Sequence, residues 1–562
     1  MSNRTLTLMM GIVAALILGV GVLFVVALAV GGGSSSNVGG PAGNDRNGDD
    51  GGSTGGGSVA GICSGDTFYT FGSDPATVLD PIQVRDEGTA HYIVEIFGGL
   101  VTLDPELNVI GDIAESWDIL DGGRRYIFHL RNDVVFHNGR LVTAEDVKYS
   151  LERAADPANN SPTVTLYLGE IVGLREKFDG VAPEISGIRV IDDFTLEIEL
   201  TEPIGHFLQA LTYPVAFVVD RQQIEQDPRN WTRRPVGTGP FVLKSFKPAE
   251  EIVLHRNDRY HLGAPWLKEV VISLGGGSLL TRYENNELHV GLVPALELDA
   301  IRAGQSRLMD EYVPRPLMAL SYLGLNHTQP PFDDPNVRKA LAMALDREII
   351  NEVLLFNAWR VADGILPPEM PGYAEAVAGI PYDPEQAKRL FDSSRYAGNF
   401  PRIVLTYAGS GGDTPDILQV YQQQWRDVLG IQVELQAVEY SQFLRELRRG
   451  TFQMYAAGWI ADYADPEDFI AKLFESDSPQ NELGYANAEV DQLIAEARVE
   501  TDQERRFALY QKAEQIILDD VAVIPTYWPV AHELVKSCVK NWPVTPMTIP
   551  KYRYLKLEAS RD

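Results

Sequence analysis

The order strand, helix, strand across residues 403–435 constrains the fold of this chain more than any other feature. Residues 403–407 are rich in β-branched residues, and residues 431–435 alternate apolar with polar residues, as strands do. Residues 414–429 between them have the pattern of a helix. Two strands joined by a helix pair in parallel through a crossover. The sequence therefore predicts an α/β sheet in this part of the chain.

Apolar periodicity predicts further elements. Strands are expected at residues 67–71 and 125–130, the second of which alternates apolar with polar side chains. Helices are expected at residues 90–100, 334–351 and 504–518, where apolar residues recur at helical spacing.

The length of the chain requires more than one hydrophobic core. At 562 residues it is too long for one core and long enough for two or three. Pro314, Pro316 and Pro525 interrupt the pattern, and we expect the chain to cross between two lobes there. The formal net charge of -30 argues against nucleic acid, because that partner demands clustered Lys and Arg.

An apolar run precedes the globular part. Residues 6–30, as a helix at about 1.5 Å per residue, are long enough to cross a bilayer core of about 30 Å. Arg4 precedes the run and the next basic residue is Arg46, which places the short N-terminus inside. The length favours an uncleaved membrane anchor, whereas the small residues near its end are typical of a cleaved export signal. Residues 31–62 are Gly/Ser-rich and predict a flexible linker.

The chain has two cysteines, Cys63 and Cys538. They lie near the start and the end of the expected globular region. If both ends return to the same lobe, they form one disulfide; two buried thiols are the alternative. Their number and spacing do not favour a zinc site.

The segment from Gly458 to Phe469 combines carboxylates with large aromatic rings. Asp462 lies between Trp459 and Tyr463, and Pro466 disfavours regular helix just before it. An aromatic wall beside a carboxylate suits a ligand with a flat or apolar body and a cationic end. The alternative is that both rings belong to the core and the aspartates are turn residues.

Motifs of common enzymes are absent from the sequence. It has no P-loop lysine, no HExxH and no GxSxG. We therefore expect a protein without catalytic residues, metal or cofactor, and an extracellular hydrolase is only a remote alternative.

Five separated motifs, in order, resemble the peptide and nickel class of extracellular solute-binding proteins, family 5, most of all the oligopeptide-binding members, and the resemblance covers essentially residues 66–560. These proteins are the receptors of ATP-driven importers. The motifs are Ala114-Glu-Ser-Trp with Tyr126 to Arg131, Phe136-His-Asn-Gly with Leu141 to Val147, Gly237-Thr-Gly-Pro-Phe, Asn326 to Arg347, and the segment from Gly458. The resemblance implies that the Asn138–Gly139 turn and the Thr143 helix cap are structural.

The resemblance implies a two-lobed periplasmic-binding-protein-like fold of class II, with the ligand cleft between two closing α/β lobes. The boundaries it implies are lobe 1 at 63–315, with an extra subdomain at about 106–225, lobe 2 at 316–524, and a C-terminal return to lobe 1 at 525–562.

The resemblance also assigns ligand-binding residues. Asp462 matches the aspartate that pairs with a peptide α-amine, and Trp459 matches an aromatic residue that lines a side-chain pocket. The further positions implied at the ligand are Tyr463, Tyr440, Tyr527 and Trp528, and the main-chain segment Arg85, Asp86, Glu87 and Gly88. Where some members carry an Arg for the peptide carboxylate, this chain has Ala456 and Ala457, so that partner is not identified.

The expected function is that of an extracytoplasmic receptor of an ABC transporter. It binds short peptides and delivers them to a membrane permease, and a monomer is expected. The alternative within the class is an oligosaccharide or nickel-chelate receptor, but a neutral sugar has no charge to offset Asp462.

Overall fold

The computed structural model describes residues 61–73, 75, 78–84, 86–409, 414–542, 545–547, 549 and 551–558. The apolar run, most of the Gly/Ser-rich segment and Arg85 lie outside these described residues. Within the described part, no helix has both the length and the apolar character to cross a membrane.

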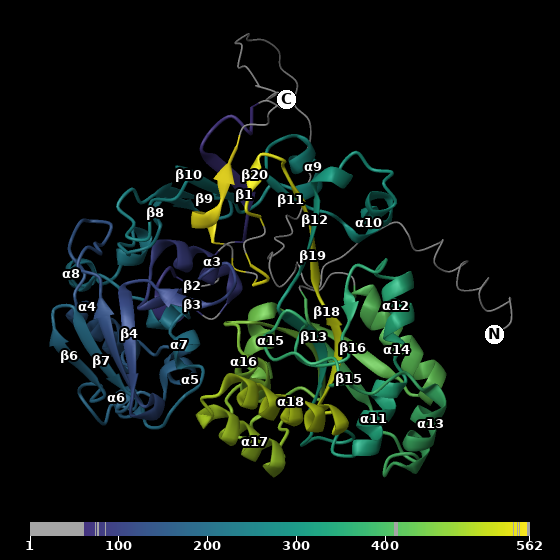
Figure 1. Cartoon of the computed structure of the whole chain (residues 1–562). Coiled ribbons are helices and arrows are strands. Elements are labelled where there is room, and N and C mark those ends of the chain that lie inside the picture. Colours follow the sequence, from purple (N-terminus) through teal and green to yellow (C-terminus); the bar gives the residue numbers. More distant parts are fainter. Residues whose placement is uncertain are drawn as a thin grey trace, which may run out of the picture.

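Lobe 2 is built on one mixed sheet of six strands (Figure 1). In spatial order the strands are β14 (Arg360–Val361), β18 (Val523–Trp528), β13 (Ala319–Leu325), β17 (Met454–Ile460), β15 (Ile403–Ala408) and β16 (Val433–Val438). β15 and β16 pair in parallel and are joined by α14 (Asp416–Leu429), which confirms the predicted crossover. Trp425 and Leu418 of α14 are buried against this sheet.

The helices of lobe 2 differ from the sequence prediction at one place. The other helices are α11 (Pro335–Met343), α12 (Arg347–Val353), α13 (Pro384–Ser393), α15 (Tyr440–Leu447), α16 (Glu467–Phe474), α17 (Ala488–Val499) and α18 (Gln503–Asp519). The single helix predicted at residues 334–351 is wrong, because α11 ends before Asp346. The Asp346 side chain caps α12 instead, accepting from the backbone N–H of Ile349 at 3.1 Å.

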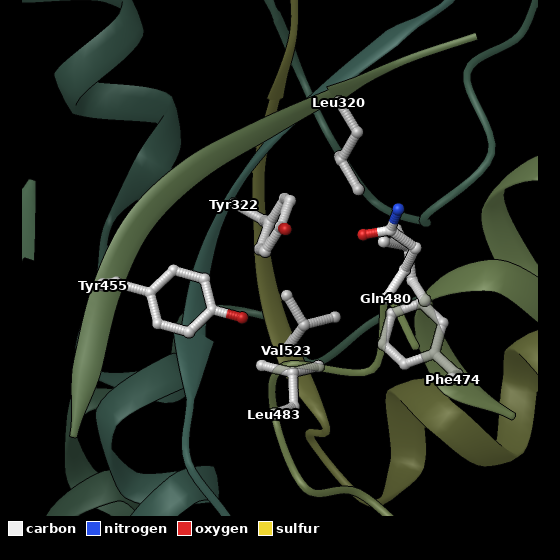
Figure 2. Close-up of a pocket in the computed structure, with 8 residues that line it drawn as sticks. Leu320, Tyr322, Tyr455, Phe474, Gln480, Leu483 and Val523 are labelled. Atoms are coloured by element: carbon white, nitrogen blue, oxygen red, sulfur yellow. The ribbon is translucent and has the colours of Figure 1, made fainter. Parts of the chain in front are cut away.

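A small cavity lies inside the core of lobe 2. In Figure 2, Tyr322 and Tyr455 stand on one side of it, and Leu483 and Val523 lie nearby. Its volume is about 240 Å³ with open solvent counted, and Gln480 is its most polar lining residue. No charged side chain lines it in the described part of the chain, so it offers nothing to hold a charged solute.

Lobe 1 contains two four-stranded sheets. The first is β1 (Thr67–Phe71), β10 (Glu269–Ser273), β9 (Glu251–Arg256) and β8 (Phe241–Lys247). The second, in the inserted subdomain, is β4 (Ala114–Leu120), β5 (Arg125–Leu130), β7 (Thr195–Glu199) and β6 (Ile188–Asp192). The helices are α3 (Glu87–Ile96), α4 (Ala144–Ala154), α5 (Val164–Leu168), α6 (Leu174–Phe178), α7 (Phe207–Ala210), α8 (Arg221–Gln226), α9 (Leu279–Glu284) and α10 (Ala295–Arg302). A hairpin of β2 (Val101–Leu103) and β3 (Val109–Gly111) precedes the subdomain.

The chain crosses between the lobes next to a third sheet of lobe 1. That sheet is β11 (Val290–Leu292), β19 (Val530–Val535) and β12 (Tyr312–Pro316). One crossing follows β12, and the other is Pro529, between β18 and β19 (Figure 1). The Leu317 N–H donates to the Pro529 carbonyl at 3.0 Å, so the two crossings lie side by side. The crossing expected at Pro525 is displaced, because Pro525 lies within β18, beside an irregularity in its pairing with β13 that accommodates a proline.

The two ends of lobe 1 are covalently linked. Cys63 and Cys538 form a disulfide with Cα atoms 5.8 Å apart. β20 (Val539–Lys540) and β21 (Lys556–Leu557) pair just beyond it.

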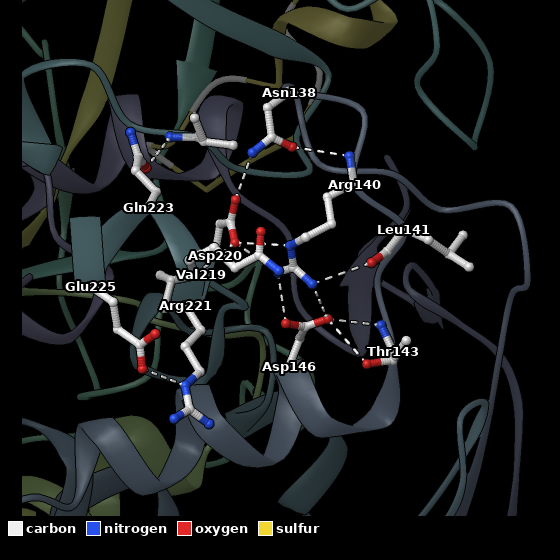
Figure 3. Close-up of polar contacts among 12 residues, drawn as sticks. Asn138, Arg140, Leu141, Thr143, Asp146, Val219, Asp220, Arg221, Gln223 and Glu225 are labelled. Carbon is white, nitrogen blue, oxygen red and sulfur yellow. Dashed lines mark hydrogen bonds and ion pairs between the residues drawn. The ribbon is translucent and has the colours of Figure 1, made fainter. Parts of the chain in front are cut away.

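The turn and cap that carry part of the family resemblance belong to a structural network (Figure 3). The Arg140 guanidinium bonds to both oxygens of Asp146, at 3.0 and 2.7 Å, and to Asp220 at 3.0 Å. The Asn138 amide also donates to Asp220, at 2.7 Å, and Asp146 completes the capping box with Thr143. Both carboxylates are buried, so this network ties the turn to α4 and α8.

We expect Arg140→Met to destabilise the protein by about 3 kcal/mol, because it leaves two buried carboxylates without their cation. Arg221 provides a matched control: its pair with Glu225 is exposed by 59% and 57%, so Arg221→Met is expected to cost less than about 1 kcal/mol. Chemical denaturation followed by circular dichroism measures both. Equal losses in the two variants would contradict the structural role of Arg140.

Candidate functional site

The candidate site is centred on the loop between β17 and α16, which contains Asp462. β17 ends at Ile460, and Pro466 immediately precedes the first residue of α16. Proline is tolerated at the start of a helix but disrupts its interior, so Pro466 fixes where the loop ends and α16 begins. The loop therefore leaves a strand at its C-terminal end, as the sequence predicted.

Asp468, on the first turn of α16, organises this loop. Its Oδ2 accepts from the backbone N–H of Asp462 at 2.9 Å and from the Trp459 indole at 3.3 Å. Its Oδ1 accepts from the Lys472 ammonium at 2.8 Å. Asp468 thus holds Trp459 and the Asp462 backbone in place, which leaves the Asp462 side chain to make other contacts.

The ammonium of Lys472 is enclosed by aromatic rings and carboxylates. The Lys472 and Asp468 side chains are 2% and 0% exposed. Nζ lies 3.8 Å from the ring centre of Tyr167 and 4.3 Å from that of Tyr463. Burial alone would lower the pKa of Lys472, but Asp468, Glu467 and Asp462 outweigh it and raise the pKa. Lys472 is therefore a fixed cation.

Lobe 1 contributes aromatic side chains to the same place. The Tyr167 hydroxyl, from α5, donates to Oδ2 of Asp462. The ring of Tyr167 stacks on that of Tyr213, with centroids 3.9 Å apart. Asp462 of lobe 2 thus meets the inserted subdomain of lobe 1 directly. A carboxylate has about four lone-pair sites, so Asp462 keeps acceptor capacity beyond this bond.

A second layer of charged pairs supports the loop from behind. The Tyr463 hydroxyl donates to Glu467, and His206 stacks on the Tyr463 ring. Asp465 accepts two bonds from Arg506, at 2.8 and 2.6 Å, with both side chains buried. Tyr463 is 1% exposed, so the structure places it as support for Lys472.

A cavity between the lobes opens onto Asp462. Its volume is about 760 Å³ with open solvent counted, and Asp462 is its only lining residue from lobe 2 among the described residues. Tyr213, Phe217 and Phe97 form part of the lobe 1 wall. A concave space with aromatic walls and a few charged groups is typical of solute sites.

The lobe 1 segment predicted to meet the ligand lies near Tyr440 of lobe 2. Tyr440 is 39% exposed, and its pKa is raised mainly by burial of its hydroxyl. The negative charges of the nearby Asp86 and Glu87 raise this pKa further. Asp86 caps α3 through Oδ1, which accepts from the Thr89 N–H at 2.8 Å, and its buried Oδ2 has no hydrogen-bond partner in the described structure. Gly88 is in the first turn of α3, and Arg85 lies outside the described residues.

Tyr527 and Trp528 are not brought to this site. Tyr527 is fully buried in the core of lobe 2, and its hydroxyl donates to the Arg347 carbonyl at 3.1 Å. Trp528 is 5% exposed and packs edge-on against Tyr373. The assignment of both to the ligand wall is corrected: β18 is buried along its whole length, so its aromatic residues face core on both sides of the sheet.

Asp468, Lys472, Tyr167 and Tyr213 were not predicted from the sequence. Asp468 and Lys472 leave a detectable pattern, since a charged i,i+4 pair whose neighbours at 469–471 and 473–474 are all apolar indicates a buried ion pair. Tyr167 leaves none, because it lies 295 residues from Asp462 in the sequence.

The charges of the site favour a cationic ligand. Asp462 and Asp468 are two carboxylates that share one buried cation, Lys472, so this cluster carries a net negative charge when both are ionised. Burial raises the pKa of Asp462, and it raises that of Asp468 to about 7. An ammonium group beside Asp462 supplies the missing positive charge and favours the ionised carboxylate.

Two α/β lobes, two adjacent crossings and an interlobe cavity with a buried charge define a two-lobed solute-binding protein. The model of the bacterial extracellular solute-binding proteins, family 5 (middle region), matches residues 108–481. The chain belongs to this family.

Individual relatives agree with this assignment. The chain is 32% identical over 493 residues to a probable deoxycholate-binding periplasmic protein of Escherichia coli, covering 85% of this chain and 90% of that protein. It is 30% identical over 481 residues to the periplasmic oligopeptide-binding protein of the same species, covering 83% and 87%. The crystal structure of a periplasmic oligopeptide-binding protein from Borrelia burgdorferi is similar, with a TM-score of 0.75 and 29% identity, covering 88% of this chain and all of that one.

Proposed function

We propose that this protein is an extracytoplasmic receptor that binds short peptides between its lobes and passes them to an ABC-type permease. The observation that carries the proposal is the buried carboxylate of Asp462, which lines the cavity and accepts a hydrogen bond from Tyr167 of lobe 1. A peptide α-amine has a reference pKa near 7.7–8.0, so it is charged at neutral pH and fits beside this carboxylate. The relative named as oligopeptide-binding supports the same ligand class.

The proposal also assigns residues 6–30 the role of a membrane anchor. The receptor then works as a monomer tethered to the outer face of the cell membrane, close to its permease, with residues 31–62 as the tether. A closed form that binds the ligand better than the open form accounts for capture and release.

Native mass spectrometry of the full chain, purified gently from cells grown in rich medium, tests the ligand class. We expect a mixture of co-purified short peptides, because pockets that contact mainly the peptide backbone tolerate varied side chains. Bound sugars, a nickel chelate or deoxycholate, in place of peptides, would reject the peptide assignment.

We expect peptide affinity to fall as the pH is lowered. Asp462 must be ionised to pair with an amine, and burial raises its pKa above the usual value, so protons compete with the ligand as the pH falls through that raised pKa. Tyr167, Lys472, Glu467 and Asp468 all act on Asp462, and Asp468 titrates nearby at about 7. Calorimetric titration from about pH 8 to about pH 5 measures the effect. An affinity that is constant or rises across this range would contradict it.

A further inference from the structure

The two lobes also touch at a place that lies outside the cavity. Residues 200–206 join β7 to α7 in the inserted subdomain, and the end of this segment lies against α16 and α17 of lobe 2 (Figure 1). The backbone N–H of Gly205 donates to the Arg498 carbonyl at 3.1 Å. Neither residue lines the cavity, so this hydrogen bond between the lobes involves no group of the solute site.

His206 makes a second contact between the lobes beside this bond. Its Nε2 lies 3.6 Å from a carboxylate oxygen of Glu467, and its ring is parallel to that of Tyr463, with centroids 6.0 Å apart. The side chains of His206 and Glu467 are only 12% and 11% exposed. The buried Nδ1 of His206 has no hydrogen-bond partner in the described structure, so the groups of lobe 2 hold this imidazole through its Nε2 and its face.

Gly205 permits the close approach of the lobes because it has no side chain. A Cβ atom at this position would lie 2.9 Å from Cδ of Arg506 and 3.0 Å from the Glu500 carbonyl oxygen, both in lobe 2. Arg506 is held in place by two hydrogen bonds to the buried Asp465, at 2.8 and 2.6 Å. The φ angle of Gly205 is not positive, so its backbone conformation is open to other residues. The lack of space between the lobes, and not backbone strain, therefore requires glycine here.

We propose that the inserted subdomain carries a closing contact, which stabilises the closed form of the protein independently of the ligand. The contact consists of Gly205 and His206 from lobe 1 and Glu467, Arg498 and Arg506 from lobe 2. Because each of its interactions joins the two lobes, the closing contact is lost when they separate. It raises the ratio of closed to open molecules by the same factor whether the cavity is empty or filled. The inference goes beyond the proposed function, since it holds for any class of solute.

The distance between two spin labels tests the closing contact in the full chain, by double electron–electron resonance. The labels are attached at Val181→Cys in the subdomain and Glu385→Cys in lobe 2, where the native side chains are 78% and 88% exposed. The two native cysteines are bonded to each other and do not take up label. Native mass spectrometry first confirms that dialysis has removed bound solutes. We expect an open and a closed distance without ligand, and Gly205→Val lowers the closed-to-open ratio by at least about fivefold.

Two further variants accompany this measurement. Gly398→Val is the matched control, because nothing lies within 4 Å of a Cβ atom at that exposed glycine of lobe 2, and it is expected to leave the ratio unchanged. His206→Ala is expected to lower the ratio, because it removes the contact with Glu467. Equal ratios in wild type and Gly205→Val, or a wild type found only in the open form, would overturn the proposal. If Gly205→Val does not fold, Gly205→Ala takes its place, because its Cβ atom alone meets lobe 2.

Calorimetric titration then separates the closing contact from the solute site. Trialanine and trilysine are expected to bind Gly205→Val more weakly than wild type by one common factor, because the substitution changes only the fraction of closed molecules. Different factors for the two peptides would show that position 205 acts on the solute site, and the proposal would be rejected. If neither peptide binds the wild type, the peptide assignment fails, while the label distances still decide whether the closing contact exists.

Discussion

Asp462→Asn is expected to weaken the binding of peptides with a free α-amine by about 10- to 150-fold. A charge-assisted hydrogen bond contributes about 1.5–3 kcal/mol net, and each 1.4 kcal/mol is a factor of ten in affinity. Asn keeps the shape of Asp and still accepts from Tyr167, so the fold of the loop is preserved and only the charge is lost. Calorimetric titration with defined tri- to pentapeptides measures the change.

Two comparisons separate this charge effect from other causes. N-acetylated peptides have no ammonium group, so wild type and variant are expected to bind them equally weakly. Asp477→Asn removes an exposed carboxylate from the same lobe and is expected to leave the affinity within about twofold, because exposed charges act weakly at a distance. If Asp462→Asn weakens acetylated and free peptides by the same factor, the amine is not held by Asp462.

Lys472→Met is expected to lower the free energy of unfolding by about 3–5 kcal/mol. Removing one partner of a buried ion pair leaves the other charge buried and uncompensated, and Lys472 serves both Asp468 and Asp462. The sign of the pH dependence follows from Asp468, whose pKa is already raised to about 7 by burial. Because the pKa of Asp468 is higher in the folded than in the unfolded protein, the folded state loses stability as the pH rises toward that pKa. The loss of the Lys472 charge raises the pKa of Asp468 further. The variant is therefore more destabilised at about pH 8 than at about pH 5.

The double variant Lys472→Met/Asp468→Asn is the matched control. It removes both charges, and the Asn oxygen still accepts from the Asp462 N–H, so we expect most of the lost stability to return. Denaturant titration of the single and double variants measures this recovery. A double variant as unstable as the single one would show that packing of the Lys472 stem, and not the buried charge, determines the loss.

The parts of the fold that could be predicted are those that depend on the pattern of apolar and polar residues within a short segment of the sequence. The parallel pair β15 and β16 follows from two apolar strands with one helix between them, all within residues 403–438. Residues 334–351 were wrongly predicted as one helix because the apolar stripe of α11 continues in phase into α12, and only Asp346 marks the break. A single capping residue within a continuous apolar stripe is weaker evidence for a helix break than the surrounding periodicity is for one continuous helix.

The site was predictable on one side only. Asp462 and Trp459 share a short segment whose composition is unusual, so they stand out without a structure. Tyr167, which bonds to Asp462, and Lys551, which lines the same cavity, come from distant parts of the chain and have no distinctive sequence context. Tyr527 was misassigned because the sequence alone does not distinguish an aromatic residue of the core from one that lines a binding site. Only the packing around β18 shows that Tyr527 belongs to the core.

The order in which the strands of lobe 1 occur along the chain has a consequence for its biosynthesis. β19 separates β11 from β12 in their sheet, yet it is made after all of lobe 2, and the disulfide joins residues 475 positions apart. Because the chain is synthesised from its N-terminus to its C-terminus, lobe 2 can assemble while this sheet of lobe 1 still lacks its central strand, β19. Contacts of such long sequence separation form slowly. We expect nascent chains in which β19 has not yet been made to expose the edges of β11 and β12, and therefore to need protection from aggregation until β19 is complete.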